Sequence, residues 1–414
     1  MTNANRLSTL RCGLHSSVSD FTSTPTLTTL QPTDGAESFL RRMRNEITRN
    51  LSSTDGRRFP RAFGGKDVSP LSLNLEFKGA NANTGGAVSD WEAKLEQGAL
   101  LASFFGAVAT ATSGAATTVD STGHTPGSGI LQVVSGTNVP VGAVIAFPTT
   151  VGMQIGQVAS KATNVLTLAS AYSGTPTTGA TVTRMGVYSV DQDKTEHKHV
   201  MFSAEQNVEA TGNLRTDYFG CAPMSMELNF PNTGLVGFAS QWGPTSWDSI
   251  APGSPSFAAP TAGNPCVVDG LTFKIGGTAY VARNAKLRFD NGTVMREAGS
   301  NVNGVLGGVC GASGPKTTIL EAELYFGGGG AIAEILEATG TIDLGDMDGT
   351  DSNAGDIATT YNVEIFNGAA ANGLLYGRLP GAEIKATVGQ ANGMTIVRLT
   401  ATNTGATGAT LAVG

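Results

Sequence analysis

Charged residues are scarce in this chain. Of its 414 residues, 14% are Asp, Glu, Lys or Arg, against about 25% in typical soluble domains. Because a solvated monomer needs charged surface to stay soluble, the shortage indicates that other subunits cover much of this surface. The alternative is a secreted β-protein with small polar side chains. The net charge of −7 argues against a nucleic-acid-binding protein, which needs a basic patch to displace counterions.

Cysteine is also rare. The four residues, Cys12, Cys221, Cys266 and Cys310, are scattered and form no CxxC pair. They fit neither a zinc site nor a disulfide framework, so we expect free thiols. No stretch approaches the ~18 apolar residues of a membrane span, and the N-terminus lacks the apolar core of a signal peptide. We expect the chain to be made and to fold in the cytoplasm.

Catalytic motifs are missing as well. There is no P-loop, GxSxG, HExxH or strand-linked GxGxxG. The glycine run 327–330 precedes a short predicted helix but lacks the Lys and Ser/Thr of a phosphate loop. Asp346 and Asp348, in the acidic stretch that ends at Asp356, resemble the start of a calcium loop, yet the terminal Glu of an EF-hand is missing. We therefore expect no enzyme activity, no cofactor and no dedicated metal site.

The chain does contain the alternation of apolar and polar residues that is typical of β-strands, and it is clearest in residues 216–243. Met224, Met226, Leu228 and Phe230 alternate with polar residues, which is the period of a half-buried strand. A turn cluster follows at 231–234, before a return strand. The sequence therefore predicts a β-hairpin.

Two further elements are predicted upstream. Residues 71–77 alternate as an amphipathic strand, and residues 91–105 carry apolar side chains at helical spacing, with Gly106 placed to end the helix. Between them and the hairpin, residues 115–183 form short β-branched runs about ten residues apart. Their spacing predicts a small inserted β-barrel or sandwich. Its strands are expected at 130–134, 142–147, 154–158, 165–168 and 180–183.

The chain also repeats itself. Leu71, Leu73 and Leu75 match Leu320, Ala322 and Leu324, and a shorter helix is predicted at 331–338. A second hairpin pattern ends the chain. The fold class predicted is mainly β, with two tandem β-sandwich or half-barrel domains, each with one flanking helix. The boundaries predicted are an arm at 1–37, a first domain at 38–114 and 184–243, the insert at 115–183, a linker at 244–265 and a second domain at 266–414.

The hairpin resembles the tail tube proteins of long, non-contractile-tailed bacteriophages. The likeness lies in Gly220, the alternation through MSMELNFPNTG and the small-residue return strand to Trp242. It extends, apart from the insert, from about Ser38 to the C-terminus. It implies rings that stack into a virion tube, with DNA passing through without specific binding and no membrane contact. A duplicated chain would form homotrimers with pseudo-sixfold symmetry. Tape measure, tail terminator and distal tail proteins would be its partners.

The predicted interaction site lies in two long loops, 52–65 and 292–314, which would hold stacked rings together. Its residues are Arg57, Arg58, Arg61, Gly64, Gly65, Gly307 and Gly308. The arginines would meet acidic residues of the next ring, so high salt should weaken stacking. A different class of function also fits the composition, namely a secreted or cell-surface β-sandwich adhesin or S-layer-type protein.

Overall fold

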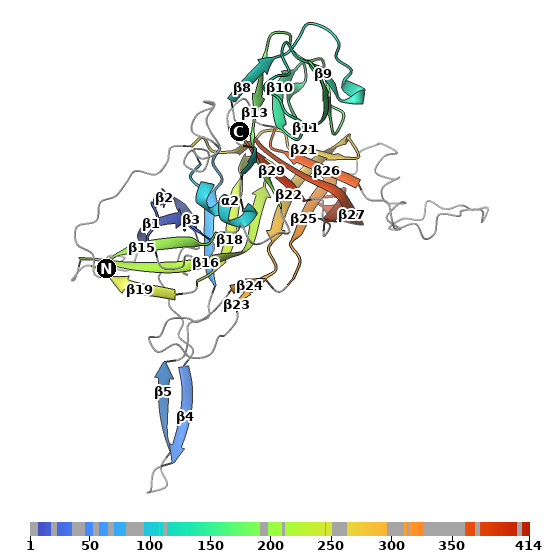
Figure 1. The fold of residues 1–414 in the computed structure, drawn as a ribbon. Coiled ribbons are helices and arrows are strands. Elements are labelled where there is room, and N and C mark those ends of the chain that lie inside the picture. Colours follow the sequence, from blue (N-terminus) through green and yellow to red (C-terminus); the bar gives the residue numbers. More distant parts are fainter. Residues whose placement is uncertain are drawn as a thin grey trace.

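The fold is mainly β (Figure 1). A computed structural model describes residues 7–17, 23–34, 46–52, 58–64, 70–79, 95–106, 108–110, 114–190, 198–208, 212–244, 246–250, 263–295, 310–312, 314–325, 361–368, 373–403 and 408–414. The largest unit is a curled sheet of 17 strands, and a six-stranded barrel is attached to it.

Eight strands of the curled sheet pair side by side and form what we call the eight-strand face. All neighbours are antiparallel. In order they are β3 (Pro32–Asp34), β6 (Leu71–Glu76), β18 (Gly237–Gly243), β16 (Gly212–Phe230), β22 (Thr278–Asp290), β25 (Thr317–Tyr325), β28 (Met394–Asn403) and β27 (Leu375–Ala391).

Two outer sheets lie behind this face. The first outer sheet is β2 (Thr28–Leu30), β1 (Leu7–Leu14), β15 (Val200–Val208), β16 and β19 (Ser246–Ile250). The second is β22, β21 (Thr272–Ile275), β26 (Tyr361–Phe366), β27, β29 (Thr410–Val413), β14 (Gly186–Ser189) and β7 (Val108–Thr110).

Strands β16, β22 and β27 belong to the eight-strand face and to an outer sheet, so each must bend. In β16 the bend lies beside a bulge, where Gly220 has φ 56°. In β27 it lies beside another bulge, where Gly381 has φ 59°. A left-handed φ is strained for other residues, and glycine adopts it freely.

One hydrophobic core fills the space between the eight-strand face and the outer sheets. The helix α2 (Gly98–Phe105) packs into it, with the Phe104 ring 5.1 Å from Trp242. The buried Glu96, just before α2, accepts a hydrogen bond from the Gln31 backbone and one from Lys78 Nζ at 2.6 Å. These contacts fix the start of the helix against the β2–β3 bend.

The barrel is a closed ring of six strands with its own core. In order these are β8 (Gly114–Thr118), β13 (Thr181–Arg184), β10 (Val144–Thr149), β11 (Gly152–Ala162), β12 (Val165–Leu168) and β9 (Ile130–Gln132). A bridge between Val119 and Val133 closes the ring from β9 to β8. Each of the five strands predicted in the insert is present. The barrel also includes β8, at its start, which the sequence did not predict.

Three two-stranded ladders complete the described fold. They are β4 (Glu46–Ser52) with β5 (Arg58–Gly64), β23 (Thr293–Met295) with β24 (Cys310–Ala312), and β17 (Gly234–Leu235) with β20 (Val267–Val268). Figure 1 shows the β4–β5 hairpin extending away from the sheets.

Several sequence expectations differ from this fold. Residues 7–14, expected in an arm, form β1. Because a bulge lies between Leu7 and Thr9, only Leu10, Cys12 and Leu14 keep the strand alternation, which is a short signal. Residues 246–250, expected in the linker, form β19. Residues 58–64, expected in a loop, form β5. The helix predicted at 91–105 begins at Gly98, because residues 95–97 form a turn, and it ends before Gly106 as predicted. The predicted helix at 331–338 lies outside the described residues.

Candidate assembly surface

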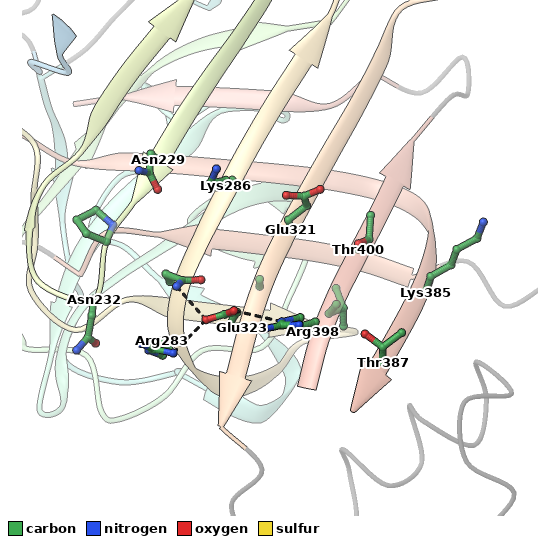
Figure 2. Close-up of a pocket in the computed structure, with 14 residues that line it drawn as sticks. Asn229, Asn232, Arg283, Lys286, Glu321, Glu323, Lys385, Thr387, Arg398 and Thr400 are labelled. Carbon is green, nitrogen blue, oxygen red and sulfur yellow. Dashed lines mark hydrogen bonds and ion pairs between the residues drawn. The ribbon is translucent and has the colours of Figure 1, made fainter. Parts of the chain in front are cut away.

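The outward side of the eight-strand face is polar and hollowed (Figure 2). In β6, β16 and β22, buried apolar residues point into the core and alternate with polar residues on this side, as Leu320 and Glu321 do in β25. Asn229, Lys286, Thr387 and Arg398 come from four different strands and line the hollow. We call this surface the polar face.

The polar face carries both signs of charge. Basic side chains come from β22, β27 and β28, and acidic ones from β16, β22, β25 and β27. The basic residues are Arg283, Lys286, Arg288, Lys385 and Arg398, and the acidic residues are Glu227, Asp290, Glu321, Glu323 and Glu383.

Ion pairs tie most of these cations to neighbouring carboxylates. Glu323 lies 3.4 Å from Arg283 and 3.4 Å from Arg398, and it accepts a hydrogen bond from Asn284. Pairs at such exposure add little to stability. Their effect is on the surface potential, since a cation held beside a carboxylate attracts phosphate less strongly. Among the described residues of this face, four of the five basic side chains are paired in this way, and Lys385 is the exception.

The junction of β16 and β22 lies in the middle of the eight-strand face. The ladder runs from Ser225 opposite Asp290 to Phe230 opposite Ala285. Leu228 lies opposite Leu287, and both side chains are fully buried. Lys286 and Glu227 form an ion pair across the same junction at 3.5 Å.

The two ends of the eight-strand face are strands with one described ladder each. From Glu383 to Ala391, β27 forms a described ladder with β28 alone. At the other end, β3 forms one with β6 alone, among the residues that the structure covers. Val388, in the end part of β27, has 47% of its surface exposed. A strand edge presents backbone groups that can pair with a strand of another chain, and Val388 lies at such an edge.

A tight hairpin turn closes the β27 end. Ala391 lies opposite Met394, and Asn392 and Gly393 between them have φ 52° and 76°. Asn-Gly with both φ positive is the type I′ turn that matches strand twist. Met394, just after this turn, is 49% exposed.

The ring-contact residues predicted from sequence are described only in part. Arg58, Arg61 and Gly64 lie on β5, opposite Ser52, Arg49 and Glu46 of β4. Arg57, Gly65, Gly307 and Gly308 lie outside the described residues. Sequence reasoning missed Val388, although its alternation with Ile384 and Ala386 on a strand was a usable signal.

The described part of the chain offers little reactive chemistry. It holds no group of three His, Cys, Asp or Glu side chains that could bind a metal, and the acidic stretch 346–356 lies outside it. Burial raises the pKa of the Cys12 and Cys266 thiols well above the usual range, so both are protonated and inert. Among the same residues, no helix is long and apolar enough to cross a membrane.

No protein-family model matches the chain, and no curated protein matches it.

Proposed function

We propose that the chain is a structural virion protein that forms rings, which stack into the tail tube of a long, non-contractile-tailed phage. The observation that carries this proposal is the order of strands in the eight-strand face. The face divides at the β16–β22 junction into two units of four strands with matching connections.

The matching strands are β3 with β22, β6 with β25, β18 with β28 and β16 with β27. Bulges support the match, since one lies between Pro32 and Asp34 in β3 and another between Ala282 and Asn284 in β22. The bend glycines Gly220 and Gly381 also match. The bulge between Pro223 and Ser225 adds one residue to β16, so beyond it Leu228 and Val388 take matching positions. The chain is then two tandem tube domains.

The repeat has a geometric consequence. Within one chain, the last strand of unit one (β16) pairs with the first strand of unit two (β22). The same contact between chains would pair β27 of one copy with the β3 end of the next. Such head-to-tail contacts form a ring when the rotation closes. Six units per ring, which the family resemblance implies, correspond to three chains.

The exposure of Val388 fits this contact. Its counterpart Leu228 is fully buried at the junction inside the chain, whereas Val388 is half exposed at the end strand. Fully burying an exposed valine contributes roughly 1.5–3 kcal/mol, so covering the exposed half of Val388 contributes about half of that. In the proposed ring, a second copy of the chain would bury Val388.

In such a ring the polar face lines the lumen. Its paired charges would let DNA pass without binding, because tight binding needs cations free to replace counterions. The β4–β5 and β23–β24 hairpins follow β3 and β22 along the chain and therefore leave the ring at its rim. There, with Arg58 and Arg61, they would meet the next ring. By the same resemblance, the tape measure, tail terminator and distal tail proteins would be the other partners.

Electron microscopy of the purified full chain tests the proposal. We expect rings or tubes whose rings have threefold symmetry. A monomer that persists at high protein concentration would contradict it.

A further inference from the structure

One side of the barrel is buried against the rest of the chain. In β10, Ile145 and Phe147 point into the barrel core, while Val144 and Ala146 point outward, yet all four are at most 1% exposed. Ile155 of β11 also points outward and is 2% exposed. A strand buried on both faces has a second layer against it.

That second layer is the second outer sheet. The outward residues of β10 and β11 form one apolar cluster with residues of β14, β26, β27 and β29, with Met185 between β13 and β14 and with Leu374 just before β27. Figure 1 shows the barrel beside these strands. The cluster, which we call the seam, consists of Val144, Ala146, Ile155, Met185, Val187, Phe366, Leu374, Tyr376 and Ala412.

Polar contacts complete the seam. Lys274 of β21 is 2% exposed, and its Nζ donates a hydrogen bond to the backbone oxygen of Ala171 in the barrel at 2.8 Å. Arg378 of β27 donates one to the side chain of Gln157 in β11. The buried Glu364 lies 3.7 Å from the Arg378 Nε and accepts a hydrogen bond from Tyr376. Two barrel groups therefore satisfy cations that would otherwise lose hydrogen-bond partners on burial.

The first outer sheet provides a control inside the chain, if the repeat of the proposed function holds. Phe366 lies opposite Tyr376 in the second outer sheet, and at the matching place Glu205 lies opposite Arg215. Arg11 pairs with Glu205 at 3.3 Å, and Arg215 with Asp217 at 2.6 Å. In the sheet that carries no barrel, Glu205 and Arg215 thus take the places of the aromatic Phe366 and Tyr376. Their partners Arg11 and Asp217, in contrast, match the charged Lys274 and Arg378.

We propose that the barrel is a permanent outer layer of the second outer sheet rather than a tethered module, and that it stays seated while the chain assembles. The seam is then an intramolecular interface between packed apolar side chains, positioned by Lys274 and Arg378. The barrel contributes the outward side of β10 and β11 to this interface. Every copy would present the free sides of its barrel in one fixed direction.

Hydrogen exchange on the full-length free subunit tests whether the barrel stays packed on the second outer sheet. Ile155→Asp places a charge in the seam without touching the barrel core. We expect at least tenfold faster exchange in β26 and in residues 375–379 of β27, with β9 and β12 of the barrel unchanged. The matched control is Val151→Asp on the same β10–β11 hairpin, where the side chain is 63% exposed, and it should change neither region. Unchanged exchange in β26 and β27 of the Ile155→Asp variant would overturn the proposal.

A disulfide lock gives a second test that does not depend on the charged variant folding. A Cβ built on Gly277 lies 3.9 Å from the Cβ of Ala171, within the range for a disulfide, although the φ of 88° strains a cysteine there. Gly277→Cys with Ala171→Cys should form the bond on oxidation, and the locked chain should assemble as fully as the reduced one. Absence of the bond, or assembly only when reduced, would contradict the proposed fixed packing of the barrel. If neither form assembles, the proposed function fails while bond formation still tests the seam.

Discussion

Leu228 of β16 lies directly opposite Leu287 of β22, and neither side chain reaches solvent. In the proposed repeat, Val388 of β27 takes the place of Leu228 and is 47% exposed. The β16–β22 contact is therefore complete inside the chain, and the proposed ring would repeat it between β27 and the next copy.

The first prediction follows from this asymmetry. Val388→Asp should weaken ring formation at least tenfold, because a carboxylate would be buried where an apolar side chain is needed. Folding should be unaffected, since the position is half exposed in the free chain. Light scattering across a concentration series measures the association.

The control for this prediction is Val151→Asp, which makes the same substitution on an exposed turn of the barrel. It should assemble like the unmodified chain. Equal assembly of the Val388 and Val151 variants would show that β27 is not the contact edge.

A second prediction concerns the β4–β5 hairpin. Arg58→Glu with Arg61→Glu should leave rings intact and shorten tubes, because both residues would face acidic groups of the next ring. Raising the salt from 0.1 to 1 M cuts the screening length from about 10 to 3 Å, so it should shorten unmodified tubes without lowering the unfolding temperature. Tube length is read by electron microscopy. Tubes of equal length under all these conditions would remove the hairpin from the ring contact.

Sequence reasoning succeeded where strands keep a strict period. The amphipathic strand predicted at 71–77 and the hairpin predicted at 216–243 are present as β6, β16 and β18. It missed β1, in which only Leu10, Cys12 and Leu14 alternate after the bulge near Leu7, and β19, which is short and lies at a sheet edge.

The candidate surface was harder to predict than the strands. The pairing of β16 with β22 joins residues about 60 positions apart, and no local pattern encodes it. The barrel seam did leave a signal, since Val144, Ile145, Ala146 and Phe147 are apolar at both parities. Such a run indicates a strand covered on both faces.

The third prediction tests the polar face. Glu323→Gln removes the carboxylate shared by Arg283 and Arg398, so two cations become free to attract phosphate. Assembled rings should then hold short duplex DNA weakly, with an affinity that falls as salt rises. Fluorescence anisotropy measures this.

The control for the polar face is Glu321→Gln, two residues away on the same strand. No ion pair of Glu321 is found among the described residues, so this variant should bind DNA no better than the unmodified rings. Tight DNA binding by the unmodified protein would contradict the assignment of this face to the lumen.

The fourth prediction concerns alkaline pH. Burial raises the pKa of the Cys12 and Cys266 thiols in the folded chain, and an unfolded thiol ionises near 8.5. The unfolded state therefore binds fewer protons above that pH, and the free energy of unfolding falls by up to about 1.4 kcal/mol per pH unit for each thiol. Below pH 8 this contribution is fully present. Denaturant titrations from pH 7 to 10.5 measure it, and Cys12→Ala with Cys266→Ala should flatten the slope. An equal slope in that variant would assign the loss to other groups.

The central claim is that β27 of one chain pairs with the β3 end of the next. Cryo-electron microscopy of the assembled protein tests it most directly. The account predicts threefold rings in which this pairing repeats the β16–β22 register and the polar face lines a continuous lumen. Rings joined through the barrels, or particles without any strand pairing between chains, would contradict it.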